Sequence, residues 1–77
     1  MEINLLSFGQ IAEITGAAAL RLEAPETTDE LLLVLRERFP ALNGIQFLLA
    51  VDQEVASENI RLHEGATVAL LPPFSGG

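Results

Sequence analysis

The stretch TTDELLLVLRERFP, residues 27–40, carries the strongest helical pattern in the chain. Thr27 and Glu30 have the spacing of a capping box, and Pro40 closes the segment. Its large apolar residues recur at helical spacing along one side: Leu31, Leu32, Leu35 and Phe39. A single helix of about eleven residues with one apolar side needs a second layer to cover that side. We interpret this helix as core-forming, because the 77-residue chain has no other element able to cover a sheet.

Short segments with the alternation of strands flank this helix on both sides. The predicted strands are residues 2–8, 20–24, 45–51, a short one around Val55, and 66–71. Predicted turns lie at residues 43–44, 52–53 and 62–65. A second, short helix over residues 9–16 fits the connection between the first two strands. This order predicts an α+β fold, a β-grasp roll with a mixed sheet and one main helix packed on one face.

The charge of the chain limits the classes of partner that it can bind. Eleven carboxylates against four basic residues, all of them arginine, give a net charge of −7. Nucleic acid and anionic membranes are bound through positive charge, so neither is expected as a partner. A basic protein surface would be the natural complement, although acidity that only keeps the domain soluble is the alternative.

Two further features indicate where the chain resides. No apolar run approaches the roughly 20 residues that a membrane-spanning helix needs. Glu2 stands where a signal peptide has positive charge. We therefore expect a cytoplasmic protein.

The side chains offer little chemistry of their own. The absence of cysteine excludes disulfides, thiolate catalysis and cysteine-ligated metals. The single histidine, His63, lies in the polar stretch NIRLHEGAT with no second histidine to share a metal, and we interpret it as a loop residue. No phosphate-binding loop is present in the sequence. We therefore expect no metal site and no cofactor bound by this chain.

The last residues, LLPPFSGG, form an unusual end for a small acidic domain. Proline lacks an N–H group and stiffens the chain, so Pro72 and Pro73 are expected to end the last strand and to start an extended segment. We accordingly divide the chain into a β-grasp domain over residues 1–71 and a tail over residues 72–77. A glycine-rich end is also typical of a slack terminus or a cloning remnant, and these residues alone leave both interpretations open.

A β-grasp domain whose last strand leads into PPFSGG resembles the small sulfur-carrier subunits of molybdopterin synthase, a family of ubiquitin-like proteins. The resemblance extends over essentially the whole chain, through the stretches LLSFGQIAEITG, TDELLLVLRERFP, LAVDQEVAS and GATVALLPPFSGG. Only the last of these is specific, since the others fit any ubiquitin-like fold. Asp29 departs from the family pattern, in which an apolar residue is expected early in the main helix.

The resemblance implies a non-catalytic subunit of a sulfurtransferase that takes part in molybdenum cofactor biosynthesis. Gly77 would be adenylated, converted to a thiocarboxylate (1-thioglycine), and would donate sulfur to cyclic pyranopterin monophosphate to form the molybdopterin dithiolene. ATP and magnesium would be used by a separate E1-like adenylyltransferase, and a donor protein would supply the sulfur. The large catalytic subunit would be the partner in a heterotetramer. The tail residues that would thread into partner active sites are Pro72, Pro73, Phe74, Ser75 and Gly76.

The same resemblance places the first and last strands side by side in the centre of the sheet. Alternation then assigns to the core face Ile3, Leu5, Val68 and Leu70. The opposite face carries the residues predicted to contact the large subunit: Leu6, Phe8 and Leu71, joined by Val55 from the neighbouring hairpin. Apolar side chains exposed together often mark a binding surface. Shielding of these side chains by loops is the alternative.

Three other functions fit the same residues. The chain could carry sulfur for thiamine, for tRNA thiolation or for cysteine synthesis. It could be a ubiquitin-like protein modifier, in which case the absence of lysine would prevent lysine-linked chains on itself. It could also be a β-grasp binding module whose Gly-Gly end has no function.

Overall fold

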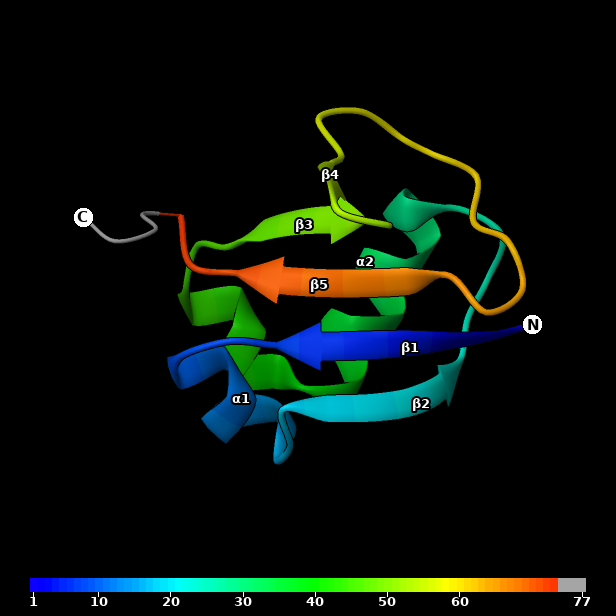
Figure 1. Ribbon diagram of the computed structural model, residues 1–77. Helices are drawn as coiled ribbons and strands as arrows, with labels where there is room; N and C mark the ends of the chain where they lie inside the picture. Colours follow the sequence, from blue (N-terminus) through cyan, green and yellow to red (C-terminus); the bar gives the residue numbers. More distant parts are fainter. Residues whose placement is uncertain (74–77) are drawn as a thin grey trace.

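Five strands form one mixed sheet in a computed structural model that describes residues 1–73 (Figure 1). The elements in chain order are β1 (Glu2–Ser7), α1 (Gln10–Thr15), β2 (Ala19–Glu23), α2 (Thr28–Arg38), the 3-10 helix η1 (Pro40–Gly44), β3 (Leu48–Val51), β4 (Glu54–Val55) and β5 (Thr67–Leu71). The strand order is β2-β1-β5-β3-β4, with β1 and β5 parallel and the other pairs antiparallel. The predicted β-grasp roll with central first and last strands is confirmed.

Helix α2 begins where the capping pattern predicts. Oγ1 of Thr27 accepts a hydrogen bond from the backbone N–H of Glu30 at 3.3 Å and donates to the Glu30 carboxylate at 3.1 Å. A second cap comes from the distant 56–66 loop, where Oδ1 of Asn59 accepts from the Asp29 N–H at 2.9 Å. Both contacts satisfy N–H groups that lack a partner within the helix. The side chain of Asp29 is exposed, so its departure from the family pattern does not disturb the core.

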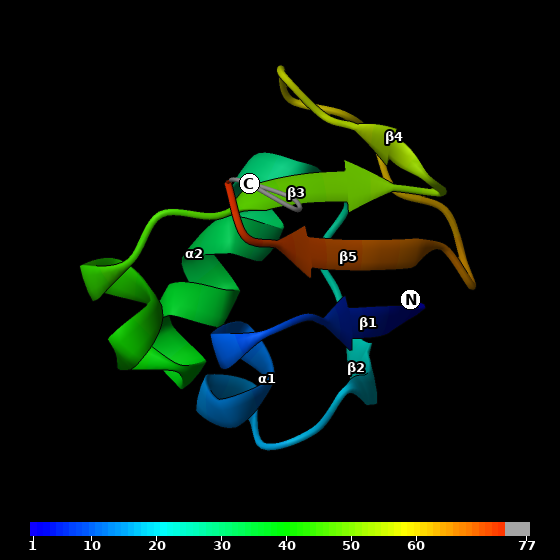
Figure 2. The same ribbon diagram turned by 60° about the vertical axis from the view of Figure 1, so that its left-hand side comes forward.

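The core lies between α2 and one face of the sheet. Ile3, Leu5, Val68 and Leu70, predicted for that face, are each at most 1% exposed. On α2, the predicted apolar side is also correct: Leu31 and Leu35 are fully buried, while Leu32 and Phe39 pack against the core as partly buried residues. Figures 1 and 2 show α1 and α2 on the same side of the sheet. Among residues 1–73, no helix covers the other face.

Two predicted segments differ from the structure. The strand expected over residues 45–51 begins only at Leu48, because η1 occupies residues 40–44 in place of a simple turn. This 3-10 helix places Leu42 at 0% exposure, with Ile45 and Phe47 packed against the core before the strand begins. The strand starts late because the segment after α2 must stay compact to bury Leu42, and an extended chain would not do so.

The predicted turn at residues 62–65 is shorter than expected. Leu62 is buried in the core, and its N–H donates to the Glu26 carbonyl at 2.7 Å. The chain turns after this point at Gly65, whose φ of +80° favours glycine. Smaller differences are that β2 spans residues 19–23 instead of 20–24, that β5 begins at Thr67, and that β1 ends at Ser7, one residue before Phe8.

Candidate functional site

Strand β5 leads to the tail from the middle of the sheet. It lies between β1 and β3 and ends at Leu71, and the two prolines follow directly (Figure 1). The predicted tail residues Phe74, Ser75, Gly76 and Gly77 lie outside the described residues. The structure therefore describes the base of the tail, through Pro73, and the surface around it.

The base of the tail packs against the turn between β1 and α1. The N–H of Phe8 donates to the Leu70 carbonyl at 3.3 Å, which extends the contact between β1 and β5 past the end of β1. Gly9 follows with φ +59°, and a Cβ atom placed there would lie 3.5 Å from Cγ of Pro72. The turn at Phe8 and Gly9 therefore fixes where the chain leaves the sheet, and it leaves Phe8 46% exposed beside that point.

A cross-strand row of apolar residues runs over the face that no described helix covers. In this row Leu6 pairs with Ala69, Ala69 with Ala50, and Ala50 with Val55. One step closer to the tail, Leu48 pairs with Leu71. We call this set the apolar patch; its residues are Leu6, Leu48, Ala50, Val55, Ala69 and Leu71.

The apolar patch includes three of the four residues predicted as the partner interface. Leu6 and Leu71 are half-buried and Val55 is 57% exposed, while the fourth, Phe8, lies just beyond the end of β1. Their role in binding stays a prediction. The sequence did not predict Leu48, which is 40% exposed, or Ala50, which completes the cross-strand row but is itself buried at 4% exposure. The segment FLLAV is apolar throughout and gave no alternation from which to assign a face.

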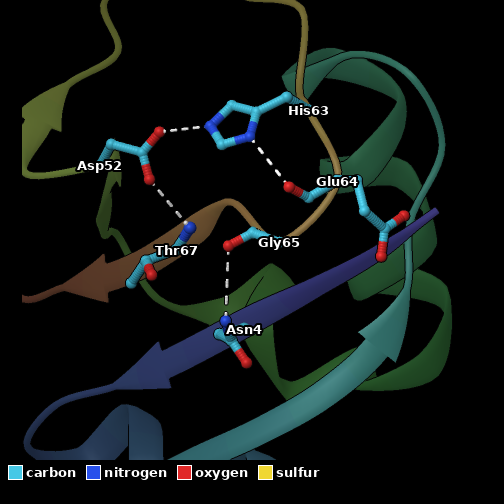
Figure 3. A network of polar contacts seen from close by, with 6 residues as sticks. All are labelled: Asn4, Asp52, His63, Glu64, Gly65 and Thr67. Carbon is cyan, nitrogen blue, oxygen red and sulfur yellow. Dashed lines mark hydrogen bonds and ion pairs between the residues drawn. The ribbon is translucent and has the colours of Figure 1, made fainter.

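The opposite end of the same face is polar (Figure 3). Asn4 pairs with Thr67 on β5 and with Arg21 on β2. Asp52, in the turn between β3 and β4, accepts a hydrogen bond from the Thr67 N–H at 3.0 Å and lies 2.7 Å from Nε2 of His63. The uncovered face is thus apolar near the tail and polar at its far end.

The contacts of Asp52 and His63 shift both pKa values. The Thr67 N–H, followed by the His63 ring, stabilises the Asp52 carboxylate and lowers its pKa. The hydrogen bond to Asp52, followed by that to the Glu64 carbonyl, raises the pKa of His63. The sequence predicted His63 as a loop residue, which is correct, but gave no sign of its partner eleven positions away.

The described part of the chain was also searched for a metal site. Within residues 1–73, no three His, Asp or Glu side chains are gathered as ligands for a metal ion. No helix in the same range has the length and apolar character needed to cross a membrane.

A β-grasp roll whose central last strand leads into a Pro-Pro and Gly-Gly segment is a ubiquitin-like domain in its architecture. Comparison with known proteins identifies the family within this class of ubiquitin-like domains. The ThiS family matches residues 5–77, and the chain belongs to this family.

Three known proteins illustrate the relationship. The molybdopterin synthase sulfur carrier subunit of Caenorhabditis elegans is 35% identical over 83 residues, which cover 100% of this chain and 99% of that protein. A complex of subunits 1 and 2 of molybdopterin-converting factor from Helicobacter pylori contains a similar chain, with a TM-score of 0.74, 25% identity and full coverage of both chains. Small archaeal modifier protein 1 of Methanosarcina acetivorans shares the fold, with a TM-score of 0.81, 22% identity and coverage of 99% and 96%.

Proposed function

We propose that this chain is the sulfur-carrier subunit of a molybdopterin synthase. The observation that carries the proposal is the end-to-end similarity to the Caenorhabditis elegans sulfur carrier subunit, which leaves almost no part of either chain unmatched. The site supports it, because the apolar patch reaches the base of the tail: Leu71 belongs to the patch and directly precedes Pro72. In this function the chain takes sulfur from one enzyme and delivers it to another, and the fold serves to present the tail.

The proposed chemistry takes place at the carboxylate of Gly77. A carboxylate is a poor electrophile, so an E1-like adenylyltransferase would join it to AMP, using ATP and magnesium and releasing pyrophosphate. Hydrosulfide supplied by a donor protein would then attack the acyl carbon and displace AMP, which leaves a thiocarboxylate. Two such transfers would supply the two sulfurs of the dithiolene to cyclic pyranopterin monophosphate, and each would regenerate a carboxylate. No side chain of this chain takes part in these steps. The steps would take place in the cytoplasm.

The residues of the tail suit this role. Pro72 and Pro73 cannot continue the β5 ladder as donors, and they stiffen the first part of the tail. Six residues from Pro72 to Gly77 reach about 20 Å when extended, enough to enter a neighbour's active site. Glycine at positions 76 and 77 would allow the backbone to pass close to the walls of a narrow channel.

We further propose that the large catalytic subunit binds over the apolar patch, with Phe8 at its edge. Exposed apolar residues that lie together on a sheet are typical of protein interfaces. The Helicobacter pylori chain of similar fold was solved in complex with a second subunit, which supports a two-subunit assembly. The base of the tail adjoins the patch, so docking there would aim the tail at the partner.

Reconstitution tests the proposal. The chain is incubated with the activating enzyme, ATP, a sulfur donor, the large subunit and cyclic pyranopterin monophosphate, and dithiolene product is measured. We expect product with the full chain and none with a chain that lacks Gly76 and Gly77, while both chains unfold at the same temperature. Sulfur transfer to a thiamine precursor or a tRNA, but not to the pyranopterin, would replace the proposal with another sulfur pathway. Covalent conjugates to proteins without any sulfur transfer would identify a modifier.

A further inference from the structure

The two-residue turn between β3 and β4 has an unfavourable backbone. Asp52 and Gln53 both have positive φ, at 49° and 75°, although neither is glycine. Two-residue hairpins with positive φ at both positions strongly prefer Asn-Gly or Asp-Gly, so glutamine at the second position is unexpected. Interactions elsewhere must therefore hold this turn in its conformation.

Asp52 supplies those interactions with three of its atoms. Its backbone N–H donates to the Thr67 carbonyl at 2.8 Å, and its Oδ1 accepts from the Thr67 N–H at 3.0 Å. Its Oδ2 accepts from Nε2 of His63 at 2.7 Å. The turn is thus tied to the start of β5 by two bonds and to the loop before β5 by a third.

His63 faces only hydrogen-bond acceptors (Figure 3). Nε2 faces the Asp52 carboxylate, and Nδ1 lies 3.0 Å from the Glu64 carbonyl oxygen. A neutral imidazole has one N–H group and can satisfy one of these acceptors, whereas the imidazolium ion donates to both. The geometry therefore favours the protonated ring, in agreement with its raised pKa.

Other charged groups on the neighbouring elements do not change this conclusion. Glu54 on β4 and Glu2 on β1 are exposed carboxylates, and the carboxylate of Glu64 accepts a bond from the Glu2 N–H at 3.1 Å. Arg61, the nearest cation along the loop, pairs with Glu26 at 3.8 Å. Of these carboxylates, only that of Asp52 contacts the His63 ring and raises its pKa.

The turn that His63 holds carries the outer edge of the apolar patch. Strand β4 consists only of Glu54 and Val55 and pairs with β3 over two residue pairs. Beyond them, the Ala56 N–H donates to the Leu49 carbonyl at 2.8 Å. Because β4 is so short and lies at the sheet edge, the position of Val55 depends on the turn that precedes it.

We propose that His63 is a positioning residue that acts through Asp52 to hold the β3–β4 hairpin in its docking position, more firmly as the imidazolium ion than as neutral imidazole. This inference rests on the proposed docking of a large subunit at the apolar patch. Docking should accordingly weaken as pH rises through the titration of His63.

The free chain provides the first test, which does not require any partner. The amide chemical shifts of Gln53, Val55 and Ala56 are followed by NMR across the titration of the His63 ring. We expect these amides to titrate with the midpoint of His63, above its usual value of about 6.5, and to lose that transition in His63→Gln. The inference is wrong if the hairpin amides do not shift as His63 titrates. It is also wrong if the same transition remains in His63→Gln.

The second test measures affinity for the purified large subunit. We expect binding by the unaltered chain to weaken about two- to fivefold between about pH 6 and pH 8, the range open to an exposed ion pair. His63→Gln should show a flat profile, while the control Glu54→Gln, which removes a charge from the same hairpin, should keep the slope. Equal slopes in the unaltered chain and His63→Gln would overturn the inference. If the large subunit binds none of these chains, the proposed function is wrong, and the titration of the free chain alone decides the inference.

Discussion

Leu48 on β3 lies directly opposite Leu71 on β5, and this pair forms the end of the apolar patch nearest to the tail. Its neighbour Leu49 points to the other face and is buried in the core at 7% exposure. Two adjacent leucines of one strand thus have different environments, one in the core and one at the surface where we propose that the large subunit binds.

This pair provides a matched test of the docking surface. Leu48→Ala should weaken binding to the large subunit by about 2 kcal/mol or more if Leu48 lies near the centre of the interface, with little change in the free energy of unfolding. Leu49→Ala should lower the free energy of unfolding by about 2–5 kcal/mol, as expected for a buried leucine. Calorimetry of binding and urea denaturation measure the two quantities. Equal losses of stability in both variants, with unchanged binding by Leu48→Ala, would exclude this end of the patch from the interface.

The cap that Asn59 provides to α2 gives a second prediction. Its Oδ1 accepts from the Asp29 N–H at 2.9 Å, so Asn59→Ala should lower the free energy of unfolding by about 1 kcal/mol. Glu58→Ala removes an exposed neighbour in the same loop and serves as the control, with an expected change close to zero. Thermal and urea denaturation provide the measurement. A loss no greater for Asn59→Ala than for the control would show that Thr27 alone caps the helix.

The shifted pKa values of Asp52 and His63 predict how stability depends on pH. The folded-state pKa of His63 is raised, so its contribution is fully present below about pH 6.5 and is lost as pH rises through the folded-state value. The folded-state pKa of Asp52 is lowered, so its contribution is present above about pH 3.9 and is lost as pH falls through the folded-state value. The pair should therefore stabilise the fold most between these limits.

Urea denaturation at a series of pH values measures this effect, with His63→Gln as the comparison. The difference in the free energy of unfolding between the two chains should be largest near the middle of the acidic window and should shrink above neutrality. Both groups are exposed, so salt should reduce the difference further. A difference that stays constant from the acidic window to well above neutrality would show that the ring stabilises the fold through packing alone.

Local patterns in the sequence were sufficient to predict much of the fold. The capping box at Thr27 and Glu30 defines the start of α2, because these contacts form within one helical turn. Alternation in β1 separates buried Ile3 and Leu5 from half-buried Leu6, because successive side chains of a strand point to opposite faces. Such features depend on neighbours in the chain and are therefore visible before the structure is known.

Features that depend on distant residues could not be predicted in this way. Leu62 lies in a polar stretch, and it enters the core because backbone bonds such as that from its N–H to the Glu26 carbonyl hold its segment beside the start of α2. The assignment of Leu48 to the surface follows from its register with Leu71. Likewise, the contact of Asp52 with His63 requires the turn and the loop to meet in space. The sequence thus predicted the strands that form the candidate site, but only some of its residues.

The central claim is that Gly77 carries sulfur as a thiocarboxylate, and intact mass spectrometry of the protein from its native cells tests it most directly. We expect a second species whose mass is raised by the replacement of one oxygen by sulfur, with the change located on the C-terminal fragment. The species should be missing from cells without the activating enzyme and from a chain carrying one extra residue after Gly77. A chain that remains an unmodified carboxylate in cells that are actively making the dithiolene would contradict the account.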